Sequence, residues 1–386
     1  MSMDNDEAHI ALLPGDGIGP EVLEAARIVL DATADRFARL IRYTEGLIGG
    51  AAIDATGSAL PQETIDACRS ADAVLLGAVG GPKWDDPSAD VRPEQGLLGL
   101  RATLGVFANL RPVKPYPCLA HTSPLRAERI AGVDLVVVRE LTGGIYFGEK
   151  RRETINDEAQ AIDVCRYSTS EIERIVRVAG DLARTRRGRV TSIDKANVLE
   201  TSRLWRSVTS RVMASEYPDV QLEHMLVDSC AMRLIQTPAD FDVIVTENMF
   251  GDILTDEAAV LSGSIGLLPS ASLGASAPGK RPVGLYEPIH GSAPSIAGKQ
   301  MANPVGSILS AALLLRHSLG WESEAHAIES AVHRAIIDGV VTVDLAGPGV
   351  AARSTTDVAR HVAELVAASD SPGAMSGAAA GSAASV

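Results

Sequence analysis

Short runs of aliphatic and β-branched residues recur along the chain, and each predicts a strand. The predicted strands span residues 9–13, 40–44, 73–78, 107–112, 133–140, 190–194, 220–227 and 242–246. Segments between several of them have apolar residues at helical spacing and predict helices at residues 21–40, 61–70, 169–187, 199–215 and 229–236. Strands that alternate with helices are typical of α/β proteins.

The strand at residues 242–246 leads into a segment whose pattern becomes helical after Gly251. Asp252 and Asp256 are four residues apart, which puts both carboxylates on one face of the helix. Two like charges repel there unless a cation lies between them, and such oxygen ligands suit Mg²⁺ or Mn²⁺. The alternative is that Asp252 caps the helix and Asp256 lies on a solvated face. The apolar side is predicted to consist of Ile253, Leu254, Ala258, Val260 and Leu261.

Charged residues stand at or beside the carboxyl ends of several predicted strands. They are Arg111, Arg139, Lys195, Asp228 and Glu247. Their recurrence predicts a composite site, in which side chains from several elements converge above a sheet. Arg101 adds a third arginine near the end of an apolar segment. Because arginine binds carboxylates with two parallel hydrogen bonds, three arginines in an acidic protein suggest a pocket for a di-acid.

Glycine-rich turns follow several predicted strands. The segment PGDGIGP, residues 14–20, has G-x-G-x-G spacing and a proline after its third glycine, which disfavours a Rossmann dinucleotide fingerprint. The segment GGPKWDD, residues 80–86, follows the strand at residues 73–78, and open α/β sheets bind ligands in such loops. Tyr146 lies in a further glycine-flanked turn, residues 143–148.

Composition excludes several functional classes. The 386 residues carry a net charge of −14, which argues against nucleic-acid or anionic-membrane partners. No apolar run reaches the ~18 residues needed to cross a bilayer. Four widely spaced cysteines without a C-x-x-C pair suggest a reducing compartment, and we expect a cytoplasmic protein. Residues 150–168 are polar and predict an arm or loop, and the Ser/Ala/Gly-rich residues 369–386 predict a disordered tail.

The order of the motifs carries a resemblance over residues 9–355. LPGDGIGPEV, GGPKWDD, GLLGLR, FANLRP, VRELTGGIYFGE, DKANVLE, VDSCAM, TENMFGDILTDEA, GLLPSASLG and EPIHGSAPSIAGKQMANP follow one another along the chain. In this combination and order the sequence resembles the isocitrate/isopropylmalate family of β-decarboxylating dehydrogenases, and within it the isopropylmalate branch. The resemblance implies two open α/β domains with a mixed twisted sheet and no Rossmann fold. It implies a cofactor-binding domain of residues 1–107 plus 262–368, and a substrate, metal and dimer-contact domain of residues 108–261.

The resemblance also implies a homodimer with shared active sites, in which Lys195 and Asp228 reach the site of the opposite subunit. Tyr146 and Lys195 are implied to carry the proton transfers. Asp228, Asp252 and Asp256 are implied to hold Mg²⁺ or Mn²⁺, and Asp228 is expected to contact the substrate as well. The substrate carboxylates are implied to be bound by Arg101, Arg111 and Arg139. The NAD site is implied to comprise Gly80, Gly81, Pro82, Lys83, Trp84, Glu94, His290, Gly291, Ser292, Ala293, Ser295, Ile296 and Asn303.

The activity implied is NAD-dependent oxidative decarboxylation of (2R,3S)-3-isopropylmalate to 4-methyl-2-oxopentanoate in leucine biosynthesis. Leu97 and Leu98, with Val198 after Lys195, predict an apolar wall that suits an isopropyl group and would leave a third carboxylate unpaired. By pattern alone, the leucines can equally form the core face of their helix. A second possibility is a relative acting on another 3-alkylmalate, on tartrate or on D-malate. A non-catalytic paralogue is disfavoured because the catalytic and metal-binding residues are retained.

Two positions depart from the family pattern. Ser295 replaces an aspartate that NAD-using members usually carry, and an aspartate there binds the adenosine ribose and repels a 2′-phosphate. We expect NAD as the cofactor, with reduced discrimination against NADP. Leu226 stands where the family often has tyrosine, which could reshape the site near the metal.

Overall fold

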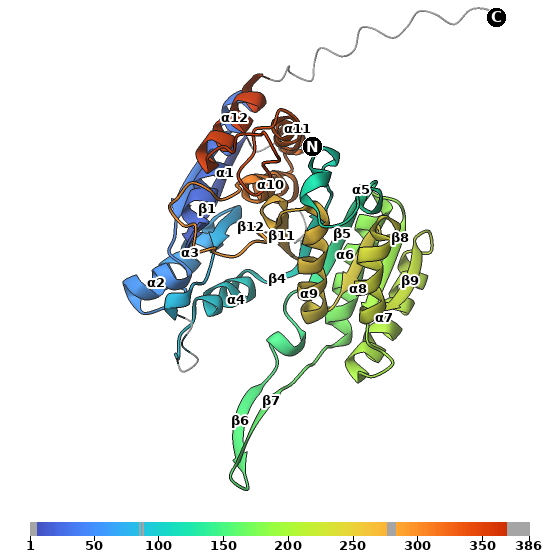
Figure 1. Ribbon diagram of the computed structural model, residues 1–386. Coiled ribbons are helices and arrows are strands. Elements are labelled where there is room, and N and C mark those ends of the chain that lie inside the picture. Colours follow the sequence, from blue (N-terminus) through green and yellow to red (C-terminus); the bar gives the residue numbers. More distant parts are fainter. Residues whose placement is uncertain (1–5, 85, 87–88, 276–282, 369–386) are drawn as a thin grey trace, which may run out of the picture.

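The computed structural model describes residues 6–84, 86, 89–275 and 283–368. One twisted sheet of ten strands runs through the molecule, in the order β2-β1-β3-β12-β11-β4-β5-β10-β8-β9 (Figure 1). The strands of this sheet are β1 (Glu7–Gly15), β2 (Leu40–Glu45), β3 (Ala73–Ala78), β4 (Val106–Val113), β5 (Leu135–Glu140), β8 (Arg189–Asp194), β9 (Gln221–Leu226), β10 (Val243–Thr246), β11 (Pro269–Gly274) and β12 (Gly284–Pro288).

The sheet is mixed, and its antiparallel part lies in the middle. Strand β11 pairs antiparallel with both β12 and β4, and β4 pairs antiparallel with β5. The remaining pairs on either side are parallel. Chain segments far apart in sequence therefore meet at β4, β5 and β10, and two of the predicted arginines stand on β4 and β5.

Helices cover the sheet and leave its strand ends open for side chains. Their bounds are α1 (Gly19–Phe37), α2 (Gly49–Thr56), α3 (Gln62–Ser70), α4 (Pro93–Leu104), α5 (Ala127–Ile130), α6 (Thr169–Arg184), α7 (Glu200–Glu216), α8 (Val227–Gln236), α9 (Asn248–Ala259), α10 (Val305–Leu314), α11 (Glu322–Ile337) and α12 (Thr355–Ala368). No helix in the described residues is long and apolar enough to cross a membrane.

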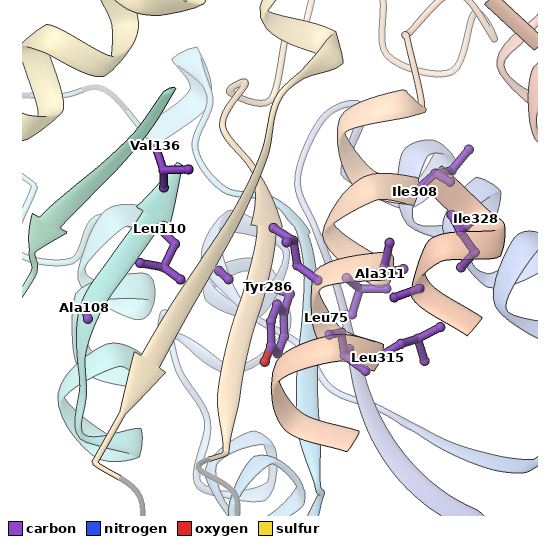
Figure 2. Packing of buried hydrophobic residues seen from close by; sticks show 14 of the residues in the cluster. Leu75, Ala108, Leu110, Val136, Tyr286, Ile308, Ala311, Leu315 and Ile328 are labelled. Atoms are coloured by element: carbon purple, nitrogen blue, oxygen red, sulfur yellow. The ribbon is translucent and has the colours of Figure 1, made fainter. Parts of the chain in front are cut away.

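The largest hydrophobic core lies between the sheet and its helices. Tyr286 of β12 and Leu75 of β3 are fully buried and face Ala311 of α10, with Ile328 of α11 behind (Figure 2). Burial of apolar surface stabilises a fold by on the order of 25 cal/mol per Å² removed from water. Such packing is therefore the main stabilising term for the scaffold. The core therefore fixes the strand ends on which the site is built.

A two-stranded hairpin projects away from the main body (Figure 1). Strands β6 (Lys150–Ile155) and β7 (Glu158–Asp163) pair antiparallel, and Asn156 and Asp157 both have positive φ. Two positive-φ residues between paired strands form the turn that matches strand twist in a two-residue hairpin loop. The predicted arm is thus regular β structure.

The elements predicted from the sequence occur in the structure, but strands β11 and β12 and helices α10, α11 and α12 were not predicted. Helix α2 was not predicted, because it is only eight residues long and begins with two glycines. Ile253 and Val260 were predicted on the buried side of α9 but are 60% and 45% exposed. The alternative that Asp252 caps α9 is wrong, because the helix begins at Asn248 and Glu247 is its N-cap. The predicted division into two domains stays a prediction, and the predicted tail lies outside the described residues.

Candidate functional site

Two buried arginines stand side by side on the central antiparallel strands. Arg111 of β4 and Arg139 of β5 are 8% and 3% exposed. Arg139 is paired in register with Asn109, two residues before Arg111 on β4. Since side chains alternate along a strand, the three side chains point to the same face of the sheet. Strand geometry thus brings together two of the three predicted carboxylate-binding arginines.

Helix α9 presents the predicted metal ligands to these arginines. Asp252 is in close contact with the Arg139 guanidinium, and its Oδ1 lies 3.6 Å from Nη2 of Arg111. Asp256, one turn later, has Oδ1 3.8 Å from Nη1 of Arg111. The Tyr146 hydroxyl donates a hydrogen bond to Oδ2 of Asp252 at 3.0 Å. Two arginines, two carboxylates and the phenol therefore form one polar cluster.

The absence of a side chain at Gly251 makes this close packing possible. A Cβ at that position would lie 2.7 Å from Cγ of Arg139 and 2.8 Å from a methyl group of Thr246. Any larger residue would push the arginine away from α9. The glycine in the FGD segment is thus explained by the approach of a buried cation.

Burial shifts the protonation equilibria of this cluster. Desolvation, followed by repulsion from Arg139, lowers the pKa of Arg111 to about 10. Desolvation also lowers the pKa of Arg139, and it raises the pKa of Asp256. For Tyr146, desolvation and the neighbouring Asp252 charge both raise the pKa of the phenol. Tyr146 therefore remains protonated at neutral pH and can donate a proton.

Within one chain, the three predicted aspartates do not come together, so they form only part of a site for an oxygen-preferring cation. Asp252 and Asp256 lie one turn apart with side chains 36% and 66% exposed, so both can reach a hard cation. Asp228 instead forms an ion pair with Lys195, and the hydrogen bond from Lys195 lowers the pKa of Asp228. Across the described residues, no three acidic, histidine or cysteine side chains gather into a metal-binding group.

The separation of Asp228 from the other aspartates follows from sheet order. Asp228 is in the first turn of α8, directly after edge strand β9. Strand β8 lies between β9 and β10, and α9 follows β10. Lys195, at the end of β8, has its backbone N–H bonded to the Ser202 hydroxyl at 3.0 Å. The Lys195–Asp228 pair therefore lies on a different part of the sheet from the Asp252 cluster.

A cavity of about 170 Å³ connects the predicted substrate and cofactor residues. Arg101 of α4 lies in its wall and donates a hydrogen bond from Nη2 to Oε1 of Glu287 at 2.9 Å. Leu97 also lines the cavity, whereas Leu98 is not among its lining residues and Val198 is 60% exposed elsewhere. The wall further includes Glu94, Arg111, Glu287, His290 and Gly291.

The predicted cofactor segments support one another through backbone contacts. Asp16 is buried, and its carboxylate accepts hydrogen bonds from the N–H groups of Gly50, Ala51 and Gly80 at 2.7–2.8 Å. The Ile18 N–H donates to the Ser292 carbonyl at 2.8 Å. The PGDGIGP loop therefore braces both the loop after β3 and the loop after β12.

Side chains in the loop after β12 leave room for a ligand. The buried Nε2 atom of His290 has no hydrogen-bond partner among the described residues, and burial lowers the pKa of this imidazole. A Cβ built at Gly291 would meet no atom within 4 Å. A buried nitrogen without a hydrogen-bond partner, next to open space at Gly291, is consistent with a site where a cofactor would bind and supply the missing hydrogen bond. Ser292 is buried, and Asn303 donates from Nδ2 to Asp344 at 3.0 Å.

Other predicted cofactor residues serve mainly as supports in the described structure. The Trp84 ring lies against Gly50, where a Cβ would come within 2.3 Å of it, and Lys83 forms an ion pair with Asp54 at 2.5 Å. These contacts attach residues Pro82–Trp84 to α2, next to Gly80 and Gly81. Ile296 and Ala293 pack against the small core around Ile18. Ser295 is exposed, and its carbonyl accepts a hydrogen bond from Lys299 Nζ at 2.8 Å.

Sequence reasoning missed several polar residues of the site. Glu287 pairs with Arg101, Thr255 accepts a hydrogen bond from Nη1 of Arg111 at 2.6 Å, and Asn248 accepts hydrogen bonds from Arg139. Asn109 could have been found by strand alternation, since it shares a face with Arg111. The other three contacts join distant chain segments, for which the sequence alone carries no local signal.

Glu247, the N-cap of α9, gives a prediction for pH-dependent stability. It is 8% exposed, accepts from the Phe250 N–H at 2.6 Å and from the Tyr167 hydroxyl at 3.2 Å, and burial raises the pKa of its carboxyl. A raised folded-state pKa means that the folded protein binds this proton more tightly than the unfolded chain does. The stability contributed by Glu247 is therefore greatest below the ordinary glutamate pKa and falls as pH rises through the folded-state value.

In the Glu247→Gln variant, the side chain at position 247 has no proton to gain or lose. The melting temperature of this variant, relative to the unmodified protein, is expected to rise steadily as pH increases from about 4 to 7. Thermal unfolding at closely spaced pH values measures this difference, with Glu158→Gln on the exposed hairpin as the control for simple loss of a charge. A difference that stays constant with pH would contradict the assignment.

Comparisons with known proteins agree with this geometry. The model of the isocitrate/isopropylmalate dehydrogenase family matches residues 9–362. The chain is 60% identical over 341 residues to the 3-isopropylmalate dehydrogenase of Anaeromyxobacter dehalogenans, covering 88% of this chain and 95% of that protein. It is 54% identical over 364 residues to that of Halalkalibacterium halodurans, covering 94% and 99%.

Solved structures give the same relationship. Isocitrate dehydrogenase from Methylococcus capsulatus superposes with a TM-score of 0.81 at 35% identity, covering 93% of this chain and 99% of that one. A β-decarboxylating dehydrogenase from Thermococcus kodakarensis gives a TM-score of 0.73 at 36% identity, covering 93% and 96%. The predicted fold class, with its mixed sheet, is confirmed. The chain therefore belongs to the isocitrate/isopropylmalate dehydrogenase family, as its motifs predicted.

Proposed function

We propose that this enzyme catalyses the NAD-dependent oxidative decarboxylation of 3-isopropylmalate in leucine biosynthesis. The observation that carries the proposal is the cavity in which Arg101, Arg111 and Leu97 lie beside His290 and Gly291. Two cationic groups next to an apolar one match a malate skeleton with an alkyl arm. The 54–60% identity to curated 3-isopropylmalate dehydrogenases supports this substrate over isocitrate.

Substrate binding is assigned to the arginines and Leu97. A guanidinium can hold a carboxylate through two parallel hydrogen bonds, so Arg101, Arg111 and Arg139 can fix both carboxylates of the malate. Leu97 offers its apolar surface to the isopropyl group, and a third carboxylate in that position would lose its water without gaining a partner. The same residues orient C2 towards the loop of His290.

Asp252 and Asp256, with Asp228, are the residues proposed to hold Mg²⁺ or Mn²⁺. When bound, the metal would supply Lewis-acid polarisation of the C2 oxygen, and NAD⁺ would supply the hydride acceptor. The exposed carboxylates at one-turn spacing and the unpartnered His290 Nε2 support these assignments. The chain's own contribution is to bind, orient and move protons at stated atoms.

Two proton transfers are assigned to side chains. Lys195 accepts the proton of the C2 hydroxyl as C2 is oxidised, which leaves a β-keto acid. Loss of CO₂ then breaks the bond at C3 and leaves an enolate, whose carbon receives a proton from the Tyr146 hydroxyl. The raised pKa of Tyr146 keeps the phenol protonated for this final step.

A homodimer with shared sites is part of the proposal. The neighbouring helices α8 and α9, with the residue that follows α9, carry large apolar side chains on their exposed surface. These side chains are Met232, Ile235, Ile253 and Val260, which are 45–60% exposed. Apolar surface of this kind supports burial against a second copy. In such a dimer, Lys195 and Asp228 of one subunit would complete the Asp252 cluster of the other. The biosynthetic reaction supports a cytoplasmic location.

The proposed activity is tested by following NAD⁺ reduction with 3-isopropylmalate, with and without Mg²⁺ or Mn²⁺. Rapid turnover that requires the metal and disappears after chelation is the expected result. Isocitrate, tartrate, D-malate and malates with other 3-alkyl groups are compared under the same conditions. A folded, metal-loaded protein that prefers one of these would overturn the substrate assignment.

Ser295 leads to a prediction about the cofactor. Because serine lacks the negative charge that repels a 2′-phosphate, the enzyme is expected to bind NADP with only moderately reduced affinity. Ser295→Asp should raise the ratio of kcat/KM for NAD⁺ over NADP⁺ about tenfold, since a new charge would face the phosphate. Dissociation constants of NADH and NADPH, measured by fluorescence titration, provide a second readout. Ser295→Asn is the neutral control of similar size, and an unchanged ratio in Ser295→Asp would contradict the prediction.

A further inference from the structure

Each of the two central arginines is oriented by a buried asparagine. Arg111 donates from Nε to Oδ1 of Asn109 at 2.7 Å. Arg139 donates from Nε and Nη2 to Oδ1 of Asn248 at 3.1 and 2.8 Å. The two asparagines are 0% and 1% exposed, so neither amide can exchange its partner for water.

The opposite end of each asparagine is also fixed. Nδ2 of Asn109 donates to the Ser272 hydroxyl on β11 at 3.0 Å, and Nδ2 of Asn248 donates to the Gly143 carbonyl at 3.2 Å. A guanidinium can only donate, so the amide oxygen must face the arginine in both cases. Asn248 thereby connects Arg139 to the turn that carries Tyr146. Each amide is held from two sides in a single orientation.

The neutrality of its hydrogen-bond acceptors sets Arg111 apart from Arg101 and Arg186, and also from Arg139, which forms an ion pair with Asp252 in addition to its bonds to Asn248. Arg186 is held by the carboxylates of Asp134 and Asp242, and Arg101 by that of Glu287. For Arg111, by contrast, the hydrogen bonds at 2.6–2.7 Å go to Asn109 and Thr255, and its nearest carboxylates are 3.6 and 3.8 Å away. A carboxylate in place of the amide would orient the guanidinium equally well but would also neutralise it.

We propose that Asn109 and Asn248 are positioning residues that orient Arg111 and Arg139, and that the neutral amide of Asn109 leaves the positive charge of Arg111 for the substrate. The inference rests on the proposed function, because it assigns those arginines to a dicarboxylate. A dianion entering the site meets two guanidinium groups whose geometry is already set, so little side-chain freedom is lost on binding. Asparagine at position 109 thus favours the binding of doubly charged substrates, and asparagine at position 248 fixes the orientation of Arg139.

Asn109→Asp is the decisive variant, because it keeps the side-chain shape and the acceptor facing Arg111. The Ser272 hydroxyl can rotate and donate to the new carboxylate, so the local hydrogen bonds are retained. The dissociation constant of 3-isopropylmalate, measured calorimetrically with Mg²⁺ and NADH present, is expected to rise about 10- to 100-fold. For 2-hydroxy-4-methylpentanoate, which lacks the second carboxylate, the rise should be clearly smaller.

Two further variants separate charge from packing. Asn109→Ala removes the acceptor without adding charge, so it should weaken binding of the dianion and the monoanion by similar factors. Asn156→Asp makes the same chemical change at the exposed hairpin turn and should leave both constants unchanged. If Asn109→Asp weakens both ligands equally, or neither, the proposed role of neutrality is wrong.

For Asn248 the test is a double-mutant cycle with Arg139→Lys, because lysine has no Nε to be oriented. Asn248→Ala is expected to lower kcat/KM about tenfold in the unmodified enzyme and less than about twofold in the Arg139→Lys background. Equal effects in both backgrounds would overturn the link to Arg139.

If the unmodified enzyme prefers another di-acid, only the proposed substrate is wrong, and the same ratios are then measured with that di-acid. An enzyme that binds no di-acid would overturn both proposals.

Discussion

Asp252→Asn is expected to lower kcat/KM for 3-isopropylmalate about a thousandfold. Asp252 is in contact with Arg139, lies 3.6 Å from Arg111 and accepts the Tyr146 hydroxyl at 3.0 Å. It therefore lies beside both arginines and accepts a hydrogen bond from the proposed proton donor, and it is itself a proposed metal ligand. An amide keeps its shape but removes the charge that a divalent cation requires.

The metal dependence of this variant provides the specific readout. If Asp252 is a metal ligand, raising the Mn²⁺ concentration should restore part of the activity of Asp252→Asn, because a weakened site fills at higher metal concentration. Asp219→Asn removes an aspartate that only pairs with Arg184 on the surface, and its activity should equal that of the unmodified enzyme. A fully active Asp252→Asn, or one whose loss is identical at every metal concentration, would contradict the assignment.

The sequence predicted those parts of the site that depend on local pattern. Arg111 and Arg139 follow apolar runs, and Asp252 and Asp256 have helical spacing, so their elements and relative faces could be derived from the strand and helix periods. The structure brings these residues together, because β4, β5 and β10 are close neighbours in the sheet. Here local pattern and sheet order point to the same place.

The parts that could not be predicted depend on contacts between distant segments. Thr255 and Asn248 accept hydrogen bonds from arginines that lie 144 and 109 residues earlier in the chain. No periodicity in the sequence predicts such a contact. Ile253 and Val260 were expected to be buried, because an apolar residue on a helix normally faces the core of its own chain. They are exposed in the single chain, and the apolar pattern of one helix does not distinguish its core face from a face that a second subunit would cover.

The same consideration applies to Lys195 and Asp228. We propose that both residues belong to the active site, yet within one chain they pair with each other and not with the Asp252 cluster. The proposed homodimer would resolve this conflict, since a second subunit could bring charged groups to a place that the chain's own sheet order does not reach. It would also cover the exposed apolar residues on and beside α8 and α9.

Mixing two inactive variants tests this arrangement directly. Lys195→Ala should lower kcat about a thousandfold, because the C2 hydroxyl loses its proton acceptor, and Asp252→Asn is nearly inactive for a different reason. If each site takes Lys195 from one subunit and Asp252 from the other, a mixed dimer contains one site with both changes and one site with neither. Random reassembly of equal amounts should then recover about a quarter of the unmodified activity.

Sites built within a single chain lead to the opposite result. In that case each subunit carries its own defect, and no mixture of Lys195→Ala and Asp252→Asn gains activity. Reassembly of Lys195→Ala with Tyr146→Phe should likewise restore activity in the shared arrangement, whereas Asp252→Asn with Tyr146→Phe should not, because Tyr146 and Asp252 are hydrogen-bonded within one chain. The pattern of which pairs complement therefore reports which residues come from the same subunit, and it does so independently of the exact alkyl group of the substrate.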